Sequence, residues 1–250
     1  MSISKTYDQS RTAVLNPSDV HSPKKDFPEV VLVTFKAKIL KALLDHFETE
    51  IIAVMNGGMD IPIYKFEYEG KTLAMYHTTI GGSATVALME EVIAMGGKKF
   101  VVFGSCGTLD RDIAAGHLIV PTEAYRDEGT SYHYLPDGDY IEVVTAERTA
   151  QILDEINAPY SKTKVWTTDG LYRETRKNME ARKSEGCLVV DMECASVMAL
   201  GLFRDVAMYQ YLYGEDTLDG DKWDKRTMDH VPQSDNEKYL QIAMDIAVRV

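Results

Sequence analysis

Short apolar runs alternate with helical segments along most of the chain, and this alternation constrains the fold more than any other feature. Strands that alternate with helices form a mostly parallel sheet whose two faces are covered by the helices. We therefore predict a single α/β domain with a mostly parallel or mixed central β-sheet and helices on both faces. Buried strands are expected at residues 30–35, 100–103, 117–121, 164–168, 189–191 and 206–213, and helices at residues 36–47, 83–95, 173–184 and 236–249.

Two segments lie outside this alternation. The alternating stretch Tyr64–Tyr68 and the run Leu73–Tyr76 flank Gly70, a pattern that predicts a hairpin. Residues 1–28 are polar and contain three prolines, so we expect an N-terminal arm ahead of a domain that spans residues 29–250. No linker, repeat or low-complexity segment divides that domain.

Composition excludes several classes of protein. The formal charge of −12 and the lack of a basic stripe exclude nucleic acid as a partner. No apolar run approaches the length of a membrane span, and the first residues lack the apolar core of a signal peptide. The three cysteines are scattered and form no Cys-x-x-Cys pair, so we expect a cytoplasmic protein without disulfides or a metal site.

Four motifs rich in glycine, hydroxyl or carboxyl groups lie where predicted strands end. In an α/β sheet, ligands bind at the carboxyl ends of the strands, so these motifs predict a small-molecule site. The glycine-rich loops that bind dinucleotides or nucleoside triphosphates are missing, which argues against a nucleotide cofactor. The four motifs are Thr79–Ser83, Gly104–Gly107, Val189–Ala195 and Gly214–Asp216.

Glu193 begins a predicted helix directly after a strand. A glutamate carboxylate offers two acceptor oxygens and no donor, which suits two neighbouring sugar hydroxyls. The alternative is an acidic helix start that the helix dipole favours.

The order and spacing of these motifs resemble the nucleoside phosphorylase family, in the branch of purine nucleoside phosphorylase and uridine phosphorylase. The resemblance runs from about Val30 to the C-terminus and includes the loop Trp166–Tyr172. It implies cleavage of the N-glycosidic bond of a nucleoside, with inorganic phosphate as acceptor and with free base and ribose 1-phosphate as products. It also implies that no cofactor is needed and that dimers or hexamers share active sites between subunits.

The resemblance assigns Asp216 to the leaving base. A departing purine gathers negative charge on its five-membered ring, and a protonated carboxyl can donate to a ring nitrogen. Such a role requires a raised pKa, from burial or from nearby acids such as Glu215 and Asp219. The alternative is a solvated acidic loop.

The resemblance also assigns binding roles to residues of the four motifs and of the N-terminal arm. The expected ribose-binding residues are Met192, Glu193 and His21, the last reaching a neighbouring subunit. The expected base-binding residues are Cys106, Gly107, Leu171 and Tyr172, and the expected phosphate-binding residues are Ser105, Lys38 and Gly82. Ser105 and the backbone amides of Cys106 and Gly107 are expected to form a turn at the end of the strand, where they can bind an anion. For the glycines, steric relief and helix packing are the alternative reasons.

The chain departs from the family where phosphorylases hold phosphate with arginines. Those positions fall on Lys38, Met59 and Val102, and neither a point charge nor an apolar side chain replaces a bidentate arginine. Phosphate is then held by Lys38, Arg126 or Arg173, or water attacks instead and the enzyme is a nucleosidase. A non-catalytic nucleoside-binding protein is the third alternative.

The base preference rests on two segments that point in different directions. Asp216 and the Gly104–Gly107 motif match the purine branch, whereas Arg126–Tyr134 resembles the uridine branch. We expect a purine nucleoside to be preferred over uridine.

Overall fold

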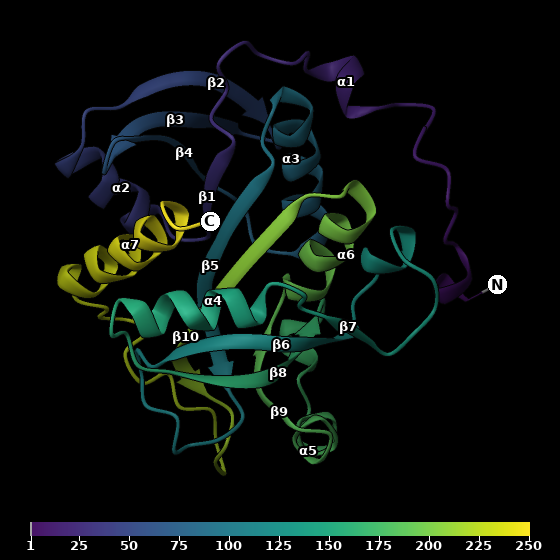
Figure 1. Ribbon diagram of the computed structural model, residues 1–250. Helices are drawn as coiled ribbons and strands as arrows, with labels where there is room; N and C mark the ends of the chain where they lie inside the picture. Colours follow the sequence, from purple (N-terminus) through teal and green to yellow (C-terminus); the bar gives the residue numbers. More distant parts are fainter. Residues whose placement is uncertain (1) are drawn as a thin grey trace.

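The protein, described over residues 2–250 by a computed structural model, is built on one mixed sheet (Figure 1). The strands are β1 (Val30–Thr34), β2 (Glu50–Asn56), β3 (Asp60–Tyr68), β4 (Lys71–His77), β5 (Lys99–Thr108), β6 (Leu118–Asp127), β7 (Tyr140–Glu142), β8 (Tyr160–Thr168), β9 (Cys187–Asp191) and β10 (Ala207–Thr217). Their order is β10-β6-β8-β9-β5-β1-β4-β3-β2, and β7 pairs with β6 beside this path.

The sheet closes on itself at one end. Strand β10 pairs in parallel with β5 and antiparallel with β6, so β10, β6, β8, β9 and β5 form a ring from which β1, β4, β3 and β2 extend. Parallel pairs join β1 to β4 and β5 and join β8 to β6 and β9, whereas the β2–β3, β3–β4, β5–β9 and β6–β7 pairs are antiparallel. The predicted α/β class with a mixed sheet is confirmed, and the closure was not predicted.

Helices cover both faces of the sheet. They are α1 (Pro17–Val20), α2 (Ala37–His46), α3 (Gly82–Met95), α4 (Ala146–Glu155), α5 (Arg176–Ser184), α6 (Cys194–Arg204) and α7 (Gln233–Ala247), with short 3-10 helices η1 (Ile3–Lys5), η2 (Ser131–His133) and η3 (Leu171–Arg173). Figure 1 shows α3 and α6 on one side of β5 and α2 with α7 on the other. None of the helices among residues 2–250 combines the length and apolar character that crossing a bilayer requires.

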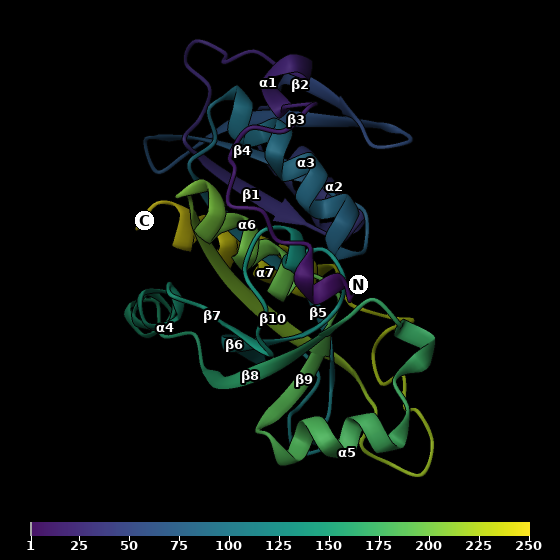
Figure 2. The same cartoon turned by 90° about the vertical axis from the view of Figure 1, so that its right-hand side faces the viewer.

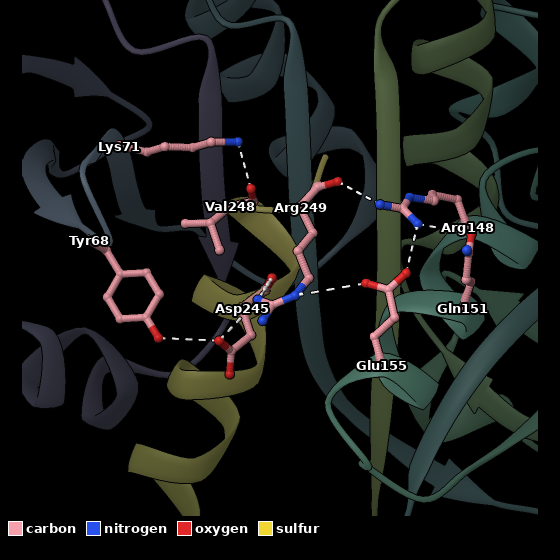
Figure 3. Close-up of polar contacts among 8 residues, drawn as sticks. All are labelled: Tyr68, Lys71, Arg148, Gln151, Glu155, Asp245, Val248 and Arg249. Carbon is pink, nitrogen blue, oxygen red and sulfur yellow. Dashed lines mark hydrogen bonds and ion pairs between the residues drawn. The ribbon is translucent and has the colours of Figure 1, made fainter.

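Polar contacts hold the end of α7 against the hairpin and α4 (Figure 3). On the hairpin side, the Tyr68 hydroxyl donates to Asp245 at 3.2 Å and Lys71 Nζ donates to the Val248 carbonyl at 2.6 Å. On the α4 side, Arg148 donates to the carbonyl of Arg249 at 2.8 Å. These contacts join the open part of the sheet to the ring.

The N-terminal segment runs along the outside of α3 and α6 (Figure 2). Arg11 pairs with Asp205 at 2.6 Å, and Lys24 N–H donates to the carbonyl of Met95 at 3.0 Å. It contains α1 and η1, so the predicted arm is extended only in part.

Candidate active site

A cavity of about 300 Å³ opens where β1, β5, β9 and β10 end. Three of the four sequence motifs contribute their functional side chains to it, and the Thr79–Ser83 motif contributes Ile80. Its lining comprises Phe35, Lys36, Ile80, Gly104, Ser105, Cys106, Gly107, Leu171, Glu174, Val190, Asp191, Met192, Glu193, Leu212, Glu215, Asp216, Leu218 and Met228. We call it the inner cavity.

The Gly104–Gly107 motif is a strand and not the turn that the sequence suggested. Strand β5 continues to Thr108, because Ser105, Cys106 and Gly107 pair with Tyr213, Gly214 and Asp216 of β10. The expected turn is therefore wrong. Ser105 still lines the inner cavity, whereas burial raises the pKa of the Cys106 thiol well above its usual range and keeps it neutral.

Glu193 occupies the N-cap of α6 and is only 8% exposed. The Gly81 N–H donates to its Oε1 at 2.6 Å, which leaves further acceptor positions of the carboxyl for a ligand. Burial and the neighbouring Asp191 raise the pKa of Glu193. Asp191 itself accepts from Cys194 N–H at 2.8 Å and from the Thr167 hydroxyl at 2.7 Å, so it fixes the start of α6.

Asp216 lies at a bulge of β10 and is 9% exposed. The indole N–H of Trp223 donates to its Oδ2 at 2.6 Å. Burial raises the pKa of Asp216, and the indole hydrogen bond opposes that shift. A Cβ at Gly107 would stand 3.4 Å from Asp216 Oδ1 and 2.9 Å from Leu218, so the glycine leaves room for both side chains.

Lys36 supplies the amine that the sequence analysis placed at Lys38. Lys36 follows β1, lines the inner cavity and forms an ion pair with the buried Glu215. Lys38 is exposed on the first turn of α2 and does not line the inner cavity, because the helix turns it away.

The other two positions at which the family carries phosphate-binding arginines, and the two arginines considered as replacements, also lie outside the inner cavity. Met59 is 60% exposed on the hairpin side, and Val102 is fully buried in β5. Arg126 is buried and donates to the hydroxyl of Ser131 and to the carbonyl of Pro136, and Arg173 is exposed.

A second cavity of about 520 Å³ adjoins the first on the side of the loop after β10. We call it the outer cavity. It shares Leu171, Glu174, Asp216, Leu218 and Met228 with the inner cavity and adds Tyr172, Arg176, Met179, Gly220, Asp221, Lys222 and Trp223. Leu171 thus lines both cavities, whereas Tyr172, at 94% exposed, lines only the outer one.

His21 and Gly82 have other contacts within this chain. His21 Nε2 lies 2.8 Å from a carboxyl oxygen of Glu91 on α3, outside the inner cavity. Gly82 is buried where α3 crosses α6, and a Cβ there would stand 2.8 Å from the Cβ of Ser196. Helix packing, the alternative reason for Gly82, therefore accounts for this glycine.

Replacing Gly82 with Ala is expected to lower the free energy of unfolding by about 1–3 kcal/mol, because the added methyl overpacks the α3–α6 crossing. Urea unfolding measures this change. In the Gly82→Ala background, Ser196→Gly should cost less than in the natural chain, since it makes space for the methyl. Unchanged stability of Gly82→Ala would contradict the packing role.

Sequence reasoning missed Lys36, Glu174 and Trp223. Lys36 directly follows a predicted strand, so the strand-end rule could have identified it. Trp223 is an aromatic residue within an acidic loop, which is a weak signal of a contact. Glu174 had no signal, because only the packing of the loop after β8 brings it to the cavities.

A comparison of the sequence with known families gives a match that covers most of the chain. The profile of the Phosphorylase superfamily matches residues 29–243. The chain belongs to this superfamily. The motifs on which the predicted resemblance rests all lie within the matched range.

Individual relatives are distant. The guanosine phosphorylase of Halorubrum lacusprofundi is 30% identical over 146 residues, which cover 55% of this chain and 58% of that protein. The match thus spans less than two thirds of that relative.

Two solved structures share the fold. A purine nucleoside phosphorylase from Toxoplasma gondii, in complex with immucillin-H, has a TM-score of 0.75 at 20% identity and covers 89% of this chain and 90% of its own. An AMP nucleosidase from Bacteroides thetaiotaomicron has a TM-score of 0.70 at 22% identity, and the match covers 88% of this chain and 87% of the nucleosidase chain. A phosphorylase and a nucleosidase therefore share this fold.

Proposed function

We propose that this protein cleaves the N-glycosidic bond of a purine nucleoside, with inorganic phosphate as the acceptor and with free base and ribose 1-phosphate as products. One observation carries the proposal. Glu193 and Asp216, which the sequence assigned to the sugar and to the base, are both buried and both line the inner cavity. The ends of β9 and β10 position them.

In this proposal, the Glu193 carboxyl accepts hydrogen bonds from two ribose hydroxyls, and it also accepts one from the Gly81 N–H. Met192, which also lines the inner cavity, packs against the sugar. Cleavage gives the sugar the character of an oxocarbenium ion, and the electron pair of the broken bond moves to the base. Asp216, which lines the same cavity, stabilises the departing base.

The acceptor would be held by Ser105 and Lys36 at the end of β5 and β1. The Lys36 amine approaches a phosphate as a point charge, and the Ser105 hydroxyl can donate one hydrogen bond. Guanosine phosphorylase and purine nucleoside phosphorylase among the similar proteins support both phosphate and a purine.

Water is the second candidate acceptor, and the charges around the inner cavity favour it. Five carboxyl residues line the cavity, and Lys36, its only basic lining residue within the described range 2–250, already pairs with Glu215. This surplus of acidic over basic groups opposes a phosphate anion wherever the carboxyls are ionised. An AMP nucleosidase is among the solved structures that share the fold.

Release of free base from inosine, adenosine, guanosine and uridine, measured with and without inorganic phosphate, tests the proposal. We expect release from the purine nucleosides only when phosphate is present, with ribose 1-phosphate as the second product. Release at the same rate without phosphate, with free ribose, would replace phosphate with water. Tight binding of nucleosides without release under either condition would identify a binding protein.

Assembly and location belong to the same proposal. We propose a homodimer or homohexamer in which His21 of one subunit reaches a neighbouring site, which light scattering of the purified protein tests. The three cysteines are free and buried, which agrees with a proposed cytoplasmic location.

A further inference from the structure

Glu174 lies at the junction of the inner and outer cavities. It is half-buried at the end of η3, and among residues 2–250 no hydrogen bond or ion pair to its side chain is formed. A half-buried carboxyl without a donor is costly in its ionised form. The site that adjoins it contains Asp216, the carboxyl assigned to the leaving base.

The two carboxyls have different environments. Asp216 accepts the indole hydrogen bond of Trp223, which favours its ionised form, whereas Glu174 has no such donor among residues 2–250. Burial and the charge of Asp216 raise the pKa of Glu174 to about 7. When two neighbouring acids have environments that separate their proton affinities, one holds the proton and the other stays ionised.

We propose that Glu174 and Asp216 act as a pair that shares one proton, in which Glu174 stores the proton that the leaving base takes up next to Asp216. The inference rests on the proposed function and adds a second carboxyl to it. Asp216 makes the contact with the base, and Glu174 acts through Asp216.

The step balances in protons and electrons. The N-glycosidic bond breaks, its electron pair moves to the base, and an oxygen of the phosphate forms a bond to the ribose carbon that the base leaves. A ring nitrogen of the base takes one proton from the pair. The pair is then left as two carboxylates. It regains a proton from solvent through the outer cavity before the next turnover.

Other charged groups around the two cavities do not take this role. Lys36 pairs with Glu215, Arg176 donates to the Gly220 carbonyl, and Glu193 accepts from the Gly81 N–H. The full set of further charged lining residues is Arg176, Asp221 and Lys222 around the outer cavity and Lys36, Asp191, Glu193 and Glu215 around the inner cavity.

The test compares guanosine with 7-methylguanosine in the presence of phosphate, for the natural chain and for Glu174→Gln. The methylated base is already positively charged and departs without a proton, so it does not need the pair. For guanosine, we expect Glu174→Gln to lower kcat by about 10²-fold and to remove the fall in kcat as the pH rises through 7. For 7-methylguanosine, the variant should retain kcat within a factor of about two.

Glu180→Gln is the matched control, because Glu180 is an exposed glutamate of α5 outside both cavities. It should leave both substrates unaffected. An unchanged rate and pH profile of Glu174→Gln on guanosine would overturn the pair, and so would an equal loss on both substrates, which indicates a structural role. Failure of the natural chain to cleave either substrate would instead overturn the proposed function.

A measurement without ligand tests the stored proton alone. Between pH 4.5, the ordinary pKa of this carboxyl, and about 7, the folded chain binds one more proton at Glu174 than the unfolded chain does. Stability from this group therefore falls as the pH rises through that window. The Tm of Glu174→Gln minus the Tm of the natural chain should be larger at pH 8 than at pH 5. An equal Tm difference at both pH values would contradict a proton held by Glu174.

Discussion

Asp216→Asn is expected to lower kcat for purine nucleosides by about 10²–10⁴-fold, the range that positioned proton transfer contributes. The amide keeps the size of the carboxyl and can still accept the Trp223 hydrogen bond, but it cannot take part in proton transfer to the base. KM should change little, because the ribose hydroxyls are bound by other residues. Steady-state release of hypoxanthine from inosine measures both constants.

The control for Asp216 is Asp229→Asn, an exposed carboxyl of the same loop that pairs with Lys225. It should retain the natural kcat, because it lines neither cavity. If Asp216→Asn also retains the natural kcat, Asp216 has no role in departure of the base.

Glu193→Gln is expected to lower kcat/KM for inosine by about 2- to 10-fold for each ribose hydroxyl that loses its carboxyl acceptor, since a hydrogen bond contributes about 0.5–1.5 kcal/mol. The amide oxygen can still accept the Gly81 N–H, so the start of α3 should be retained. Competition between inosine and 2′-deoxyinosine measures the effect. The natural chain should prefer inosine, and the variant should show little of this preference.

Glu142→Gln serves as the control for Glu193, because Glu142 is exposed on β7, away from both cavities. It should keep the natural preference for inosine. A preference that persists unchanged in Glu193→Gln would show that another group binds the 2′-hydroxyl.

The sequence predicted the parts of the fold that depend on local periodicity. The hairpin around Gly70 and the strand-then-helix passage at Glu193 are both present, because apolar spacing and turn residues specify them locally. Strand β2 was missed because it is mostly exposed and lacks a clear alternation. The closure of the ring depends on the long-range pairing of β5 with β10, which also converts Gly104–Gly107 from a turn into a strand.

The residues of the candidate site were also predicted only in part. Glu193 and Asp216 lie on strand ends that the sequence identifies, and the structure brings both to one cavity. Lys36 rather than Lys38 lines the inner cavity, because Lys36 precedes the first turn of α2 whereas Lys38 lies within it. Glu174 and Trp223 come from loops whose packing no periodicity encodes.

The most direct measurement of the central claim is a crystal structure of the Asp216→Asn variant with inosine at a concentration that saturates it in solution. We expect the nucleoside in the inner cavity, with ribose hydroxyls on the Glu193 carboxyl and the purine beside residue 216 and Leu171. A nucleoside bound elsewhere, or placed with its base at Glu193, would contradict this assignment of the site.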